Sequence, residues 1–120
     1  MPEKLDIKVL EGILWASVSG RFSLENAETF LLEILRRARS EGINKILIDA
    51  RGITTEISTI ARFEFGNYLA AQNPYQTLIA IVGSENAVWP DRFLENVLVN
   101  RGVDVKVVTE IKEALKWLTE

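Results

Sequence analysis

The stretch over residues 45–69 constrains the fold more than any other part of the chain. It opens with a run of three apolar residues that ends in Asp49, and a helical pattern comes directly before it. A strand that follows a helix has no room to turn back as a hairpin, so it should lie parallel to its neighbour and be buried on both faces. Residues 45–49 are therefore predicted to form a parallel strand, followed by a polar turn that holds Asp49 and Arg51.

The first part of the chain predicts an antiparallel hairpin at a sheet edge. Apolar and polar residues alternate over 5–10, and Glu11-Gly12 has the composition of a two-residue turn. Residues 13–19 are predicted to form the second strand, with Trp15 on the face opposite its two neighbours.

Four segments carry apolar residues at helical spacing. Their expected limits are Ser23 as N-cap to Gly42, a start between Thr54 and Ser58 to Asn73, Trp89 to Gly102, and Thr109 as N-cap of the last helix. The second helix should turn Ile57, Ile60, Ala61, Phe65 and Leu69 inward. Two more buried strands are predicted over 78–82 and 103–108.

The resulting order is β-β-α-β-α-β-α-β-α, which predicts an α/β fold with a mostly parallel sheet and an antiparallel N-terminal hairpin. With 120 residues and no linker-like segment, we expect residues 1–120 to be a single domain. The functional crevice of such a sheet lies beyond the carboxyl ends of its parallel strands. Here those ends fall at 49–53, 83–89 and 108–109.

Composition argues against several functions. The net charge of -3 argues against a nucleic-acid-binding surface, because such a surface carries clustered Lys and Arg. The first residues are charged and no apolar run reaches membrane-spanning length, so we expect no membrane insertion and a cytoplasmic location. His and Cys are both absent, which excludes a Ser-His-Asp triad, a Cys-His pair and a histidine or thiolate metal site. No cofactor motif is present. We expect a protein that is not an enzyme and holds no cofactor.

Two roles remain open for Asp49 and Arg51. As a functional pair, an acid and a guanidinium at a strand end form a site for a polar ligand or partner. As a structural pair, Asp49 accepts backbone N–H groups and binds Arg51, which fixes the loop; we favour this role because Asp commonly does so in turns. Mg²⁺ binding by Asp49 with Glu56 or Asp91 is a further alternative.

The start of the second helix is rich in hydroxyl groups, at Thr54, Thr55, Ser58 and Thr59. Capping explains one of the four. Phosphorylation is the alternative, since a phosphate at a helix N-terminus meets free N–H groups.

Aromatic residues near this segment, Phe63, Tyr68, Tyr75 and Trp89, could line a groove or a contact surface, although core packing is the usual fate of such residues. Phe63 is offset from the apolar stripe and is the best candidate for exposure. The predicted interaction surface consists of Asp49, Arg51, Thr55, Ser58, Arg62, Phe63 and Trp89.

The sequence resembles the STAS domain family (sulfate transporter and anti-sigma-factor antagonist), whose fold is called SpoIIAA-like. The similar stretches are GILWASVSGRFS, KILIDARG, ARFEFGNYLA, IAIVGS and NRGVDVKVVTEIKEALKWL. In anti-sigma-factor antagonists, a partner kinase phosphorylates a serine in an Asp-Ser-Ser-Gly motif at this helix start. Ser58 is the nearest position here, within the sequence Glu56-Ile57-Ser58-Thr59.

The resemblance implies a stand-alone, STAS-like regulatory module that binds an unidentified protein partner or a second copy of itself. The alternative is a carrier of a small apolar, lipid-like ligand, because the fold also resembles CRAL-TRIO domains. Such a carrier would need an apolar pocket under the second and third helices. A carboxylate-based enzyme is a third hypothesis.

Overall fold

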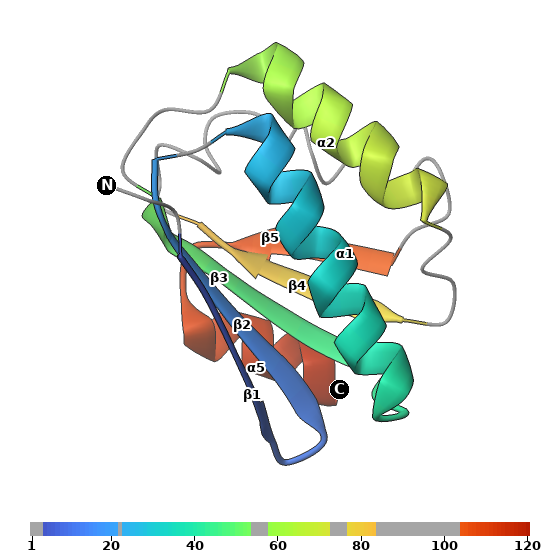
Figure 1. The fold of residues 1–120 in the computed structure, drawn as a ribbon. Helices are drawn as coiled ribbons and strands as arrows, with labels where there is room; N and C mark the ends of the chain where they lie inside the picture. The colour runs from blue at the N-terminus through green and yellow to red at the C-terminus, as the bar shows by residue number, and fades with distance from the viewer. Residues whose placement is uncertain (1–3, 22, 54–57, 73–76, 84–103) are drawn as a thin grey trace.

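The computed structural model describes residues 4–21, 23–53, 58–72, 77–83 and 104–120. Its five-stranded sheet has the order β1-β2-β3-β4-β5 (Figure 1). The strands are β1 (Lys4–Leu10), β2 (Ile13–Gly20), β3 (Lys45–Ile53), β4 (Leu78–Val82) and β5 (Asp104–Val108). β1 and β2 are antiparallel, and every other neighbouring pair is parallel. The predicted mixed sheet with an antiparallel edge hairpin is confirmed.

The hairpin turns at Glu11 and Gly12, as predicted. Their φ angles are 52° and 77°, and the strands pair up to Leu10 opposite Ile13. Two consecutive positive φ angles are typical of a type I′ turn, whose twist matches that of the flanking strands. Glu11 adopts the left-handed conformation despite its Cβ, because a type I′ turn requires a positive φ at both of its central residues.

In the part of the chain that the structure describes, α1 (Leu24–Ser40) and α2 (Thr59–Ala71) cover one face of the sheet and α5 (Ile111–Thr119) covers the other (Figure 1). α1 and α2 lie side by side on the first face, and α5 packs on the second, against β3, β4 and β5. The helix predicted from Trp89 to Gly102 lies outside the described residues.

Alternating side chains of the strands fill two hydrophobic clusters. Ile46 and Ile48 of β3 contribute to the cluster under α1 and α2, which also contains Leu31 and Ile34 of α1. Leu47, between them, belongs to the cluster under α5. β3 is therefore buried on both faces, as its uninterrupted apolar run predicts. Trp15 packs against the α5 cluster, on the face expected for it.

Both ends of α1 follow from the sequence. Ser23 is the N-cap, and its hydroxyl accepts a hydrogen bond from the N–H of Asn26 at 3.1 Å. Gly42, at φ 67°, ends the helix with a Schellman motif, in which Gly42 N–H donates to Arg39 C=O and Ile43 N–H donates to Ala38 C=O.

The prediction for the start of α5 was wrong by one residue. Its N-cap is Glu110, not Thr109, and no side-chain hydrogen bond caps the helix. The position of α5 is set by Ala114 and Leu118, which are fully buried against the sheet. The favourable cap chemistry of a threonine one residue earlier is therefore overridden by packing.

Candidate interaction surface

β3 continues beyond the point where a turn was predicted. Its last pair with β4 is Asp49 opposite Val82, but β3 remains paired with β2 as far as Ile53. The expected polar turn after Asp49 is therefore part of a strand. The reason lies in β2, which extends to Gly20 and offers β3 backbone partners after β4 has ended.

An irregularity in strand pairing marks this end of β3. Ser17 pairs with Asp49 and Ser19 pairs with Gly52. An advance of two residues along β2 therefore corresponds to an advance of three residues along β3. The extra residue lies in β3, as in a β-bulge, which re-aims nearby side chains. The backbones approach closely there: a Cβ atom at Gly52 would lie 2.8 Å from Ser19 Cβ and 3.1 Å from the carbonyl oxygen of Val18.

Asp49 and Arg51 form a bidentate ion pair beside this bulge. Arg51 Nε and Nη2 donate to Asp49 Oδ1 and Oδ2, each at 2.9 Å, and the backbone N–H of Arg51 donates to Oδ1 at 3.1 Å. Of the two roles that the sequence left open for this pair, these contacts are those of the structural role. The side chain of Asp49 is 20% exposed and that of Arg51 is 49% exposed, so the guanidinium presents its outer edge to solvent.

The pair fixes the charge of both groups. Hydrogen bonding from the Arg51 side chain lowers the pKa of Asp49 below its ordinary value, against the opposing effect of partial burial. The same hydrogen bond raises the pKa of Arg51. Asp49 is thus held ionised with both oxygens occupied, which suits a fixed polar feature rather than proton transfer near neutral pH.

Ser58 caps α2. Its hydroxyl accepts a hydrogen bond from the N–H of Ala61 at 3.1 Å, and the first turn contains no acidic residue. The helix therefore begins, as predicted, within the hydroxyl-rich segment. Thr59 is the first residue of α2, whereas Thr54 and Thr55 lie outside the described residues.

α2 carries large apolar side chains on its outer surface. Ile60 is 72% exposed and Phe63 is 41% exposed. The exposure predicted for Phe63 is confirmed, while the inward orientation predicted for Ile60 is wrong. Leu69 is fully buried and Phe65 packs against the core, so the inner row runs through residues four apart. Ile60 lies one position off that row.

A sequence feature could have revealed the orientation of Ile60. Glu64 follows it by four residues, which places both side chains on the same side of a helix. Because Glu64 is exposed, Ile60 is exposed with it.

Other predicted site residues are placed only in part. Tyr68 packs on the core cluster under α1 and α2. Arg62 lies within α2, and its side chain is outside the described part of the chain. Trp89 and Tyr75 also lie outside it, so the structure does not bring Trp89 together with the other residues.

The metal and carrier hypotheses involve residues that are not described. Both suggested partners of Asp49 in a Mg²⁺ site, Glu56 and Asp91, fall in undescribed segments, and no group of three or more Asp or Glu side chains gathers elsewhere among the described residues. The carrier pocket would involve the helix predicted within 84–103, so that hypothesis also stays untested. None of the helices described here is both long and apolar enough to cross a membrane.

Comparisons with known proteins agree with the fold. No family model and no curated protein matches the sequence. The structure is similar to the crystal structure of an anti-sigma factor antagonist from Mycobacterium paratuberculosis, with a TM-score of 0.66, 14% identity, and coverage of 99% of this chain and 96% of that one. It is also similar to the NMR structure of the protein TM1081, with a TM-score of 0.57, 20% identity, and coverage of 95% and 87%. The STAS-like fold implied by the sequence resemblance is confirmed.

Proposed function

We propose that this protein is a non-enzymatic regulatory module that binds a partner protein through one region, the α2 surface. We define this surface as the outer side of α2 with Ile60 and Phe63, the cap Ser58, and the Asp49–Arg51 pair at the end of β3. Ile53 and Ser58 are five residues apart, so the two parts lie within about 20 Å of each other. The exposure of Ile60, at 72%, is the observation that carries the proposal.

The α2 surface has the chemistry of a protein contact. Covering an exposed isoleucine contributes on the order of 1.5–3 kcal/mol, which is available only if another molecule binds. An aromatic side chain and an arginine lie in the same region, and both residue types are enriched among the residues that dominate binding energy. Since Asp49 holds the Arg51 side chain in place, little conformational entropy is lost when a partner contacts it.

The comparison and the side-chain inventory support a binding role over catalysis. The anti-sigma factor antagonist has the same fold and is named for acting on another protein. This chain contains no His and no Cys, and the carboxylate at the strand end is committed to an ion pair. We extend the proposal to a cytoplasmic protein whose partner is a regulatory protein.

The start of α2 is the place where we propose that binding is controlled. Ser58 is exposed, and its hydroxyl oxygen already faces the N–H groups of the first turn. A phosphate there would add nearly two negative charges next to the helix N-terminus and beside exposed apolar side chains. It would be tolerated by the helix and would change what the α2 surface can bind. Thr55 is a second candidate acceptor from the sequence alone.

The first experiment replaces Ile60 with Asp, using Ile60→Leu as the matched control. Asp at the second helical position favours the helix dipole, so α2 should remain folded in both variants. We expect wild type and Ile60→Leu to capture a partner protein from the native cytoplasm, and Ile60→Asp to fail to capture it. The affinity of each form for that partner is then measured with purified components. Equal binding of all three forms would exclude the α2 surface.

A second experiment tests control at Ser58. Ser58→Asp and Ser58→Asn both keep a good N-cap and differ only in charge. The charged variant is expected to weaken partner binding while the neutral variant does not. Mass spectrometry of protein from its native cells should find a phosphate at Ser58 or Thr55. If both residues stay unmodified under every growth condition, the phosphorylation part of the proposal fails and the binding part stands.

A further inference from the structure

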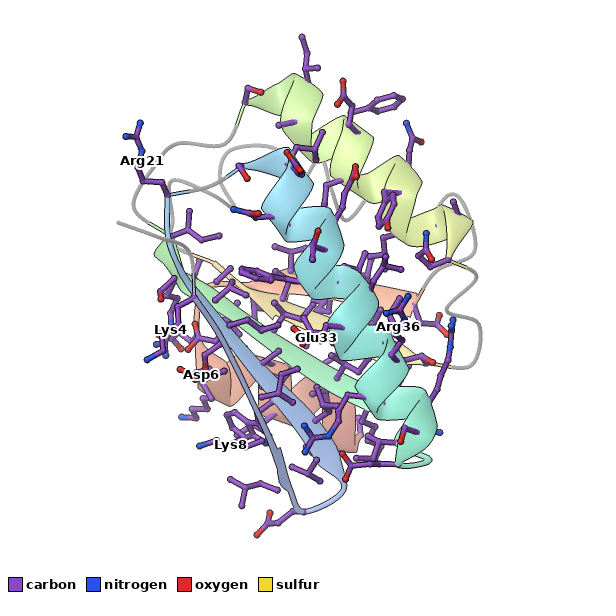
Figure 2. The ribbon with its side chains drawn as sticks, viewed as in Figure 1. Lys4, Asp6, Lys8, Arg21, Glu33 and Arg36 are labelled. Atoms are coloured by element: carbon purple, nitrogen blue, oxygen red, sulfur yellow. The ribbon has the colours of Figure 1, made fainter. Side chains whose placement is uncertain are left out.

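The outer edge of β1 is a second exposed surface that the proposed function does not use. β1 is the first strand in the sheet, and among the described residues its only hydrogen-bonded neighbour is β2. Two of the four exposed large hydrophobic residues in the described structure are here, Val9 at 38% and Leu10 at 48%. Figure 2 shows Lys4, Asp6 and Lys8 following one another along the strand.

The turn geometry determines which backbone groups of β1 point outward. In a two-residue type I′ hairpin, the residues flanking the turn exchange both hydrogen bonds, and bonded and non-bonded pairs then alternate. Leu10 flanks the turn. Leu5, Ile7 and Val9 therefore direct their N–H and C=O groups away from β2, which leaves a regular set of donors and acceptors for another strand.

The charge pattern of β1 matches the strand itself. We propose that β1 pairs antiparallel with β1 of a second copy about a twofold axis through Ile7, which joins the two sheets edge to edge. Asp6 then lies opposite Lys8 of the second copy, and this pair occurs twice. On the other face, Leu5 lies opposite Val9 of the second copy, which covers an exposed apolar side chain.

The other registers are worse. A shift by one residue would place the apolar side chains of one strand against the polar face of the other. An axis through Asp6 would place Asp6 against Asp6 and Lys4 against Lys8, and an axis through Lys8 would oppose two lysines. An axis through Leu5 pairs Lys4 with Asp6 but overlaps only residues 4–6. The axis through Ile7 overlaps all seven residues of β1.

The charges are exposed, so they select the register more than they add affinity. The side chains of Lys4 and Asp6 are 71% and 70% exposed, and their ion pair within the strand, at 3.7 Å, is weak. Lone charges on an edge strand oppose uncontrolled pairing. The alternating charges oppose the axes through Asp6 and Lys8, and only the axis through Ile7 joins opposite charges while keeping all seven residues paired. Because a seven-residue edge buries less area than a standard interface, we expect a dissociation constant in the range of roughly micromolar to hundreds of micromolar.

The first test is a charge swap followed by sedimentation velocity over a dilution series. Wild type is expected to show a concentration-dependent monomer–dimer equilibrium. Asp6→Lys turns two attractive pairs into two repulsive ones and should weaken the dimer at least about tenfold. The double variant Asp6→Lys with Lys8→Asp restores opposite charges across the axis and should restore the dimer. Lys8 also lies 5.5 Å from the centre of the Trp15 ring, so circular dichroism must show that each variant is folded.

The second test identifies the register. The chain has no Cys, so single introduced cysteines report only on the contact. In the proposed dimer, residues 6 and 8 are directly opposite in a non-hydrogen-bonded pair, whose Cα atoms are about 4.5 Å apart, within the range that a disulfide spans. A mixture of Asp6→Cys and Lys8→Cys proteins should cross-link as the heterodimer more than either variant alone.

Three outcomes would overturn the proposal: a wild-type monomer at every concentration, a dimer that Asp6→Lys does not weaken, or preferential cross-linking of Lys8→Cys to itself. Ile60→Asp serves as the control on the opposite part of the molecule. It should leave the dimer unchanged, so the self-pairing of β1 and the partner-binding role of the α2 surface can fail independently.

Discussion

α1 and α2 lie side by side on the same face of the sheet, but they distribute their apolar side chains differently. α1 buries Leu31, Ile34, Leu35 and Ala38 along one side and exposes charged residues such as Glu33 and Arg36 on the other (Figure 2). α2 buries Leu69 but leaves Ile60 and Phe63 exposed. The first helix has the one-sided pattern of an element that closes a core. The second carries large apolar residues on both its buried and its exposed side.

This difference separates residues that stabilise the fold from residues that are exposed for binding. α1 is held in place by its N-cap, its C-terminal Schellman motif and its buried apolar stripe. All three are contacts within the molecule. The end of β3 and the start of α2 have their own fixing contacts, at Gly52, Asp49 and Ser58, but Ile60 on the outer side of α2 is 72% exposed and is little buried by the fold. Substitutions in the two regions should therefore affect stability and binding in opposite proportions.

The largest difference is expected between Leu31→Ala and Ile60→Ala. Leu31 is 1% exposed, so its truncation leaves a cavity and should lower the free energy of unfolding by about 2–5 kcal/mol. Ile60 loses almost no internal contact, and its truncation should change stability by less than about 0.5 kcal/mol. Urea denaturation measures both. If Ile60→Ala lowers the free energy of unfolding as much as Leu31→Ala does, Ile60 stabilises the fold and is not simply exposed for binding.

Two glycines provide the next comparison. Gly52→Ala should destabilise by about 1–3 kcal/mol, because the new Cβ would overlap Ser19 and the backbone of β2. Gly42→Ala is the control at the end of α1: there is space for a Cβ, and only the positive φ of 67° opposes it, at about 1 kcal/mol. Thermal unfolding ranks the two. A smaller effect at Gly52 would mean that the strands separate easily at the bulge.

The two caps are expected to be equivalent. Ser23→Ala and Ser58→Ala each remove one hydroxyl acceptor from a helix N-terminus and should each cost about 1 kcal/mol. Replacement by Asn should recover most of the loss in both. Chemical denaturation measures the free energy of unfolding of these four variants. A loss of stability at only one of the two caps would contradict the prediction.

The smallest effect concerns Asp49. Because the folded state lowers the pKa of Asp49 below the ordinary value of 3.8, its ionised form stabilises the fold. That contribution is complete above the unfolded value and disappears as the pH falls below 3.8 toward the folded value. Asp49→Asn should therefore be less stable than wild type at neutral pH, and the difference should narrow in acid. A difference that stays constant from pH 7 to pH 2 would show that the ion pair contributes nothing.

Local patterns predicted most of the fold. The Glu11-Gly12 turn, the Ser23 cap and the Gly42 stop each depend on residues within one turn of the chain, and all three are confirmed. The parallel direction of β3 followed from its position directly after a helix. Those features require no knowledge of distant residues.

The site depended on distant residues and was predicted less well. The extension of β3 to Ile53 results from the length of β2, and the bulge results from how Ser19 meets Gly52. Neither is visible in the local sequence. The orientation of Ile60 depends on how α2 is rotated about its own axis against its neighbours. A rotation equivalent to one residue position would turn Ile60 from an exposed to a buried side chain.

The unequal lengths of β3 and β4 also affect how the molecule can open. Among the described residues, β3 has a strand on one side only over 50–53, whereas it has strands on both sides over 46–49. Amide hydrogens in the outer part should therefore exchange with solvent sooner than those in the inner part, through local fluctuations that leave the core closed. In the proposed α2 surface, a partner bound at Arg51 would therefore act on a strand end that, among the described strands, is held by β2.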